Sequence, residues 1–399
     1  MKKQFVKASI VTTGNMPAAA SSKIFIEGMA APPFEYNLLA DAYSYNGYHT
    51  KCINLKAALT VGAGFEIFPG NPDDYDENLF SDEKEKIESF LYQHQIQTGQ
   101  SFIETLLNFQ TDYEIYGNAY FEICRNKKGI PSAIYHLPAN SIKVLYKNKL
   151  TYIAQTANLD EIIFSPFGVM EPDKNEYLSM KSYNPQNLFY GLPEYFGALS
   201  AIILDRNAVE FNINKFNNNA IPESIIVIKG ASLSDLAKTR IKQFFADNVK
   251  GVKNAGKSLI LEMENTNGTI DIKNIAETVP DSSFRNMRLD ARDEIIAAHG
   301  VPKRLLGIVE GGNIAGTNET RNQLKIFQDC VIEARQRRLE FLLNNRLLME
   351  GLKIKNCKIL FNRPYAENPQ QDANFYKTMI ENGVLTPEEV KAELGYTIN

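Results

Sequence analysis

One octapeptide of the chain has the residue types that bind the phosphates of a nucleotide. Residues 251–258 read GVKNAGKS and match the pattern G-x-x-x-x-G-K-[ST]. In a nucleotide hydrolase this loop leaves a buried strand and opens a helix, so that backbone N–H groups converge on phosphate. Here the sequence predicts the reverse order, a helix over 233–249 before the loop and a strand over 258–262 after it. We therefore favour a turn, with a P-loop-type nucleotide hydrolase using Lys257 and Ser258 as the alternative.

The histidines do not form a recognisable catalytic or metal-binding pattern. Their positions are His49, His94, His136 and His299. No HExxH motif or Cys/His cluster includes any of them. His299 ends a predicted helix, where we expect a partial positive charge on its imidazole to complement the helix dipole. We predict no catalytic residue, no metal and no cofactor, and therefore a protein that is not an enzyme.

The cysteines and the charge balance narrow the class of protein. Cys52, Cys124, Cys330 and Cys357 are far apart and form no CxxC pair, so we expect core thiols rather than disulfides or zinc ligands. The chain has 399 residues, 43 Lys and Arg against 47 Asp and Glu, and a formal net charge of -4. No overall basic field therefore attracts it to nucleic acid, so any DNA contact must be local or shared among subunits.

The length of the chain predicts two or three domains, and its hydrophobic content predicts that they fold. The distribution of apolar residues predicts no membrane span. Of the chain's residues 44% are hydrophobic, but no apolar run approaches the roughly 20 residues that span a bilayer. Thr12, Thr13, Gly14 and Asn15 interrupt the apolar run that a signal peptide needs, which predicts a cytoplasmic protein.

The N-terminal half has the pattern of an α+β fold. Residues 1–35 lack periodicity and predict an arm, with folded structure from about Pro33. Interrupted helical stripes predict two short helices over 36–63. Further helices are expected over 83–92 and 101–116, and antiparallel strands over 118–124, 134–136 and 142–154.

The C-terminal half is dominated by long helices around a smaller α/β segment. Gly191-Leu192-Pro193 opens a helix that should run from 193 to about 218. We then expect a strand over 223–230, the helix over 233–249, and two strands around a tight turn at Asn267-Gly268. The remaining expectations are a helix over 284–299, a glycine-rich loop over 301–317, a long helix over 319–349, a strand-like 353–365, and two small helices, the second capped by Thr386 and Glu389.

Several of these stretches resemble the PBSX-type branch of the tailed-bacteriophage portal protein family. They are YGLP at 190–193 with the helix after it, FNNNAIP at 216–222, GVKNAGKSLIL at 251–261, FRNMRLDARDEIIAAHGVPKRLLG at 284–307, and TPEEVKAELG at 386–395. The segment at 284–307 is the most specific of them. The resemblance covers about residues 36–399 and is strongest over 190–350.

The resemblance implies a portal-type fold with long stem helices, an inserted α/β clip, an α+β wing and a short C-terminal helical crown. The implied regions are an N-terminal arm at 1–35, the wing at 36–190, a stem helix at 191–219, the clip at 220–280, a second stem helix at 281–300, a tunnel loop at 301–317, more wing at 318–371 and a reduced crown at 372–399.

The resemblance also implies a function and partners. Portal proteins form a ring, usually a dodecamer, at one capsid vertex of a virion, and double-stranded DNA is packaged and ejected through it. The implied partners are the terminase large subunit, the head–tail connector or adaptor, and the major capsid and scaffolding proteins, with assembly in the host cytoplasm and no membrane. A non-channel capsid-vertex or adaptor protein is a further alternative.

Basic residues near the predicted loops are the candidate contacts. Lys303 and Arg304, with Asn313 and Thr317, would face DNA in the tunnel loop, and a mildly acidic chain suits a channel in which tight phosphate contacts would stall sliding. Alternatively, Lys303 and Arg304 solvate a helix-to-loop corner or pair with Glu310. Candidate clip contacts with a partner protein are Lys250, Lys253 and Lys257, for which an ordinary solvated turn is the alternative.

Overall fold

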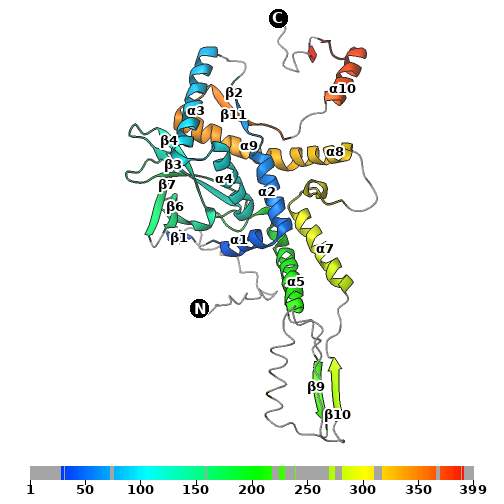
Figure 1. Ribbon diagram of the computed structural model, residues 1–399. Helices are drawn as coiled ribbons and strands as arrows, with labels where there is room; N and C mark the ends of the chain where they lie inside the picture. The colour runs from blue at the N-terminus through cyan, green and yellow to red at the C-terminus, as the bar shows by residue number, and fades with distance from the viewer. Residues whose placement is uncertain are drawn as a thin grey trace.

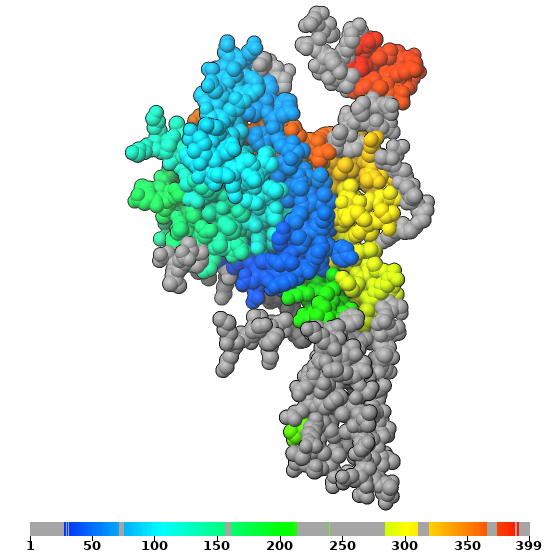
Figure 2. Space-filling view, viewed as in Figure 1, coloured from blue at the N-terminus to red at the C-terminus, as the bar shows by residue number. Residues whose placement is uncertain are grey.

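The protein has an α+β body from which a narrow projection extends (Figure 1). The described elements of the projection are the helices Leu199–Asn217 and Asp281–Ala298 and the strands Ser224–Lys229 and Thr269–Asn274. The computed structural model describes residues 28–30, 32–71, 76–157, 160–217, 224–229, 239, 269–274, 281–309, 317–364, 369–387 and 389–390. Figure 2 shows that residues of α1 to α4 and of the neighbouring strands pack closely into the body, while α10 lies at the end of the molecule opposite β9 and β10.

Helices occur in both halves of the described chain. The α-helices are α1 (Tyr36–Tyr45), α2 (Gly47–Val61), α3 (Glu77–Thr98), α4 (Phe102–Tyr116), α5 (Leu199–Asn217), α7 (Asp281–Ala298), α8 (Thr317–Phe327), α9 (Glu333–Phe341) and α10 (Pro369–Glu381). Shorter 3₁₀ segments are η2 (Ala139–Ser141), η3 (Glu194–Ala198) and η5 (Lys303–Leu306), and π-helical segments are η6 (Gln328–Ile332) and η7 (Leu342–Leu352).

The strands lie in three sheets. They are β1 (Gly28–Ala30), β2 (Phe65–Pro69), β3 (Asn118–Arg125), β4 (Pro131–Leu137), β5 (Ile142–Lys147), β6 (Leu150–Ala157), β7 (Asp160–Pro166), β8 (Glu176–Lys181), β9 (Ser224–Lys229), β10 (Thr269–Asn274) and β11 (Cys357–Phe361). The large sheet has seven strands in the order β1-β5-β6-β7-β8-β3-β4, with only the β7–β8 pair parallel. β9 pairs with β10, and β2 pairs with β11.

The seven-stranded sheet is buried on both faces at β3. Along β3, Tyr120 belongs to a core with α1 and η3, whereas Phe121 belongs to a second core with α4 and α9. This alternation is what the two-residue period of a strand requires. Phe121 stacks on Phe109 of α4 with ring centroids 3.8 Å apart. The sheet is therefore the platform on which the helices of both halves are placed.

Local sequence signals explain where the helices of the body begin and end. Asn46 caps α2 by accepting a hydrogen bond from the backbone N–H of His49. Ser101 and Glu104 form a reciprocal capping box at the start of α4. Gly117 ends α4 at a φ of 68°, a left-handed conformation that suits glycine.

The structure corrects the predicted extent of the N-terminal half. Folded structure begins before Pro33, because residues 28–30 pair antiparallel with β5. The run at 142–154 is two strands rather than one, since Asn148 and Lys149 turn the chain at positive φ. The helix expected over 83–92 is the longer α3, capped by Asp76. The sequence patterns do not predict β2, β7 or β8.

The projection contains the elements that the sequence predicts there. η3 and α5 together occupy the predicted helix over 193–218, and α7 occupies the one over 284–299. Beyond their far ends lie β9 and β10 (Figure 1). The predicted helix over 233–249, apart from helical Thr239, and the strand over 258–262 lie outside the described residues.

The long C-terminal helix is confirmed, and two of its segments, η6 and η7, are π-helical. α8, η6, α9 and η7 follow one another without a break over 317–352.

Cys330 is exposed in η6, so the prediction that all four cysteines are core thiols is wrong for this one. The predicted cap at the C-terminus is present, because Glu389 N–H donates to Thr386 Oγ1 and Thr386 N–H donates to Glu389 Oε2. No described helix combines the length and apolarity that crossing a membrane requires.

Candidate functional site

Four charged side chains fix the base of the projection inside the body. Lys56 of α2 lies 2.6 Å from Glu114 of α4, and Arg335 of α9 lies 2.5 Å from the other Glu114 oxygen. Arg335 also pairs with Glu194 of η3, the element that leads into α5. Lys56 and Glu114 are almost completely buried. We call these four residues the charge cluster.

Glu114 and Arg335 of the charge cluster stay ionised although they are buried. Burial raises the pKa of Glu114, but the charges of Lys56 and Arg335 outweigh it and lower this pKa to about 2. Burial lowers the pKa of Arg335, yet Glu114 and Glu194 raise it above its ordinary value. Because removing one member would leave an uncompensated buried charge, the cluster ties α2, α4, η3 and α9 into one arrangement.

A pair of neutral histidines lies beside the charge cluster. His49 Nδ1 is 2.8 Å from His299 Nε2, and the ring of Tyr195 packs against both imidazoles. Burial, with a contribution from Lys56, lowers the pKa of His49 to about 3. The same causes lower the pKa of His299. The predicted partial positive charge on His299 at the helix end is therefore wrong, and this residue instead joins the end of α7 to α2.

The two helices of the projection are joined by a polar contact near the body. Arg288 Nε of α7 donates to Asp205 Oδ1 of α5 at 2.8 Å, and Asn46 Nδ2 donates to Asp205 Oδ2 at 3.1 Å. Asp205 is 5% exposed, so it bridges α5, α7 and the α1–α2 corner from a buried position.

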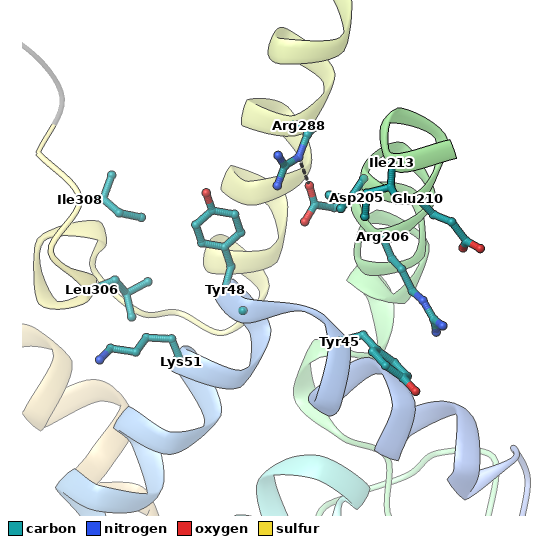
Figure 3. Close-up of a pocket in the computed structure, with 12 residues that line it drawn as sticks. Tyr45, Tyr48, Lys51, Asp205, Arg206, Glu210, Ile213, Arg288, Leu306 and Ile308 are labelled. Carbon is teal, nitrogen blue, oxygen red and sulfur yellow. Dashed lines mark hydrogen bonds and ion pairs between the residues drawn. The ribbon is translucent and has the colours of Figure 1, made fainter. Parts of the chain in front are cut away.

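A pocket of about 670 Å³ opens next to this contact (Figure 3). Val209 and Ile213 of α5 and Leu306 and Ile308 near η5 give it apolar walls. The start of α2, the preceding Tyr45 and several charged side chains complete it. We call it the α5 pocket.

The structure gives the two basic residues of the proposed tunnel loop carboxylate partners. Lys303 Nζ lies 2.7 Å from Asp293 Oδ2 of α7, and Arg304 Nη2 lies 3.4 Å from Glu319 Oε2 of α8. Thus η5 is held between the two helices, while the pairing with Glu310 considered from sequence stays a prediction. Residue 310 and Asn313 lie outside the described residues, while Thr317 begins α8.

The three lysines proposed for the clip lie outside the described residues. These are Lys250, Lys253 and Lys257, and the GVKNAGKS loop belongs to the same stretch. The described part of this region is the β9–β10 ribbon, whose six residue pairs run from Ser224↔Asn274 to Lys229↔Thr269.

Sequence reasoning did not find the charge cluster or the histidine pair. Their members come from segments as far apart as His49 and His299, and single-sequence spacing carries no information on such contacts. One signal is present in the sequence, because Lys56 interrupts a largely apolar stretch of predicted helix. Within the part of the chain that the structure describes, no three His, Cys, Asp or Glu side chains are grouped to hold a metal ion.

Comparisons with known proteins identify the family. The sequence model of the phage portal protein family matches residues 50–395. The uncharacterized protein YqbA of Bacillus subtilis (strain 168) is 24% identical, with 98% of this chain and 88% of that protein covered. The phage-like element PBSX protein XkdE of the same organism is 22% identical, with 93% and 84% covered.

A solved structure has the same fold. In the neck of a native gene transfer agent (GTA) particle, computed with C12 symmetry, one chain superposes with a TM-score of 0.62 at 19% identity, covering 95% of this chain and 98% of that chain. The α+β fold described above is thus a portal-type fold. Since the family model spans most of the sequence, the chain belongs to the phage portal protein family.

Proposed function

We propose that this portal protein assembles as a closed ring, most simply a dodecamer, at one capsid vertex, and that its channel carries double-stranded DNA during packaging and ejection. The observation that carries the proposal is the family match over 50–395. The C12 neck particle with the same fold supports a ring of twelve. The paired helices α5 and α7, which extend away from the body, suit a stem that lines such a channel (Figure 1).

The regions expected from sequence give a division of labour within the ring. We assign α5 and α7 to the stem, residues 220–280 to the clip, 36–190 and 318–371 to the wing, and 372–399 to a reduced crown. The charge cluster supports this assignment because Glu194, just before α5, pairs with Arg335 of the wing helix α9, so that a force on the stem would reach the wing through this ion pair.

Residues 301–317 are proposed as the tunnel loop that meets DNA. The ion pairs of Lys303 and Arg304 leave η5 with little net positive charge. Attraction to DNA phosphates grows with the number of phosphates that a protein neutralises. Paired cations therefore suit weak contact with moving DNA better than tight binding.

The proposed partners follow the position of each region in a capsid. The clip would meet the terminase large subunit during packaging and a head–tail connector afterwards, and the wing would meet the major capsid and scaffolding proteins. The protein would then be a virion component that is assembled in the host cytoplasm. It is proposed as a structural protein without catalytic activity.

Deletion of residues 310–316 tests the tunnel-loop assignment. This deletion removes no residue of η5, of its ion pairs to α7 and α8, or of the α5 pocket. We expect rings of unchanged mass, but particles that package or retain at least about tenfold less DNA, measured as protected DNA per particle. In a matched control variant, residues 310–316 are replaced by a glycine–serine segment of the same length, so that no residue is lost. Full packaging by the deletion variant would contradict the assignment.

Nucleotide hydrolysis distinguishes the alternative P-loop function. A portal ring should release no phosphate from ATP above background, and Lys257→Ala should change nothing. ATP turnover that Lys257→Ala abolishes would favour the hydrolase instead.

A further inference from the structure

The α5 pocket is bordered by apolar side chains that remain exposed. Ile213 is 52% exposed and Tyr45 is 60% exposed, and Arg206 stacks on the Tyr45 ring at 4.0 Å. Figure 3 shows these side chains around a hollow between α5, α7 and the first helices. Exposed apolar side chains that gather around one pocket favour a contact site there.

A second apolar stripe runs along the other flank of α5. Leu204 is 45% exposed and Phe211 is 53% exposed. They are seven residues apart, so they lie on one face of the helix. Phe211 is supported by a stacked contact with Phe284 of α7, at 5.3 Å between ring centroids. We call Leu204 and Phe211 the knob.

The α5 pocket and the knob lie on opposite sides of α5, at nearly the same position along the helix axis. At 3.6 residues per turn, the stripe of Arg206, Val209 and Ile213 lies about 180° around α5 from the knob. The two stripes are displaced along the axis by two residues, or about 3 Å. α7 covers the side between them, through Asp205 and the buried Ala208. Each copy of α5 therefore presents the pocket on one flank and the knob on the other.

We infer that the knob of one copy fills the α5 pocket of the next copy in the ring, an inference that rests on the proposed ring. A closed ring of more than two copies joins two different faces of each subunit, so a pocket needs a complementary knob elsewhere on the same chain. The occupant matches the apolar part of the lining, because Leu204 and Phe211 would meet Val209, Ile213 and Leu306. The charged side chains of the lining include Asp205 and Arg288, which already pair with each other.

A charge exchange between copies tests this contact. Phe211→Lys should place an ammonium group against Val209, Ile213 and Leu306, in a pocket whose charged lining is net positive, with Lys51, Arg206 and Arg288 against Asp205 and Glu210. Ile213→Glu should place a carboxylate against the apolar ring of Phe211. Each single variant should raise the concentration for half-maximal ring assembly by about tenfold or more, since burial of one large apolar side chain is lost at each interface. Tyr92→Lys on α3, at an equally exposed position, is the matched control and should assemble as the unchanged chain does.

A mixture of the two variants separates direct contact from general damage. When equal amounts of Phe211→Lys and Ile213→Glu chains are mixed, alternating copies pair Lys with Glu at one interface and retain Phe211 with Ile213 at the next. We expect rings at near-normal concentration, measured by mass photometry. Single variants that assemble normally, or a mixture that stays impaired, would overturn the inference while leaving the ring intact. An unchanged chain that forms no ring would overturn the proposed function together with the inference.

A disulfide gives a second test that does not depend on impaired assembly. In a chain with Cys330→Ser, which removes the exposed native thiol, Phe211→Cys and Ile213→Cys are combined. The two positions cannot join within one helix because residues i and i+2 do not face each other. Oxidation should yield a ladder of covalent oligomers for the double variant and none for either single variant. Rings without a ladder would contradict the contact.

Discussion

At the residue scale, the attachment of the projection to the body depends on buried ionised side chains that lie beside buried neutral histidines. Glu114 is held between Lys56 and Arg335, while His49 and His299, a short distance away, are kept uncharged by burial and by the Lys56 charge. Acid destabilises the folded chain at both places, because it protonates the Glu114 carboxylate and puts a charge on the two buried imidazoles. Low pH should therefore weaken the contacts among α2, α4, η3 and α9 at the base of the projection.

The histidine pair predicts a pH dependence of stability above the range in which carboxylates titrate. The pKa of His49 falls from 6.5 to about 3 in the folded chain, so the unfolded chain binds more protons as the pH drops below 6.5. Folded stability should fall from pH 6.5 to 4.5, by about 1.4 kcal/mol per pH unit for each histidine. His299→Gln should lower stability at pH 7 but show a less steep decline. Denaturant unfolding followed by circular dichroism measures this, and equal slopes in both proteins would contradict the explanation.

The charge cluster predicts a large cost for a nearly isosteric change. Glu114→Gln leaves Lys56 and Arg335 buried without their central carboxylate, which should reduce the free energy of unfolding by about 3–5 kcal/mol. Glu161→Gln is the matched control, because its 3.4 Å pair with Lys143 is exposed. That change should cost at most about 1 kcal/mol. Similar costs for both variants in urea unfolding would show that the cluster is not a structural anchor.

At the element scale, helices with strong local signals could be predicted and long-range pairings could not. Caps and apolar periodicity located α4, α5 and α7, because those signals lie within a few residues of the helix. β2 is not predicted from sequence because β11, with which it pairs in the described part of the chain, lies almost 300 residues further along. The α5 pocket was missed for the same reason, since α2, α5, α7 and η5 supply its walls.

The close approach of two loops predicts which glycine the fold requires. A Cβ on Gly191 would lie 2.1 Å from the carbonyl oxygen of Gly117 and 2.8 Å from the backbone nitrogen of Ser182. Gly191→Ala should therefore lower the free energy of unfolding by about 3 kcal/mol or more, since neither backbone segment can move without disturbing the sheet. Gly197→Ala, where nothing lies within 4 Å of the added carbon, should change stability by at most about 1 kcal/mol. Thermal unfolding of the two variants compares them, and equal melting temperatures would contradict the proposed close packing.

At the scale of the whole molecule, the pieces fit a ring rather than a solitary subunit. The chain carries a net charge of -4, which gives no general attraction to DNA, and the basic residues at η5 are paired. A conduit needs neither catalytic groups nor tight binding, but it needs a stem whose two flanks fit each other. The α5 pocket and the knob supply such flanks.

The measurement that tests the account most directly is the solution mass of the purified full-length chain together with axial electron-microscope class averages of the same sample. The account predicts a closed ring, of about twelve copies by analogy with the C12 neck particle, with a central channel about as wide as a DNA duplex. A stable monomer, or a closed assembly without a central channel, would contradict it.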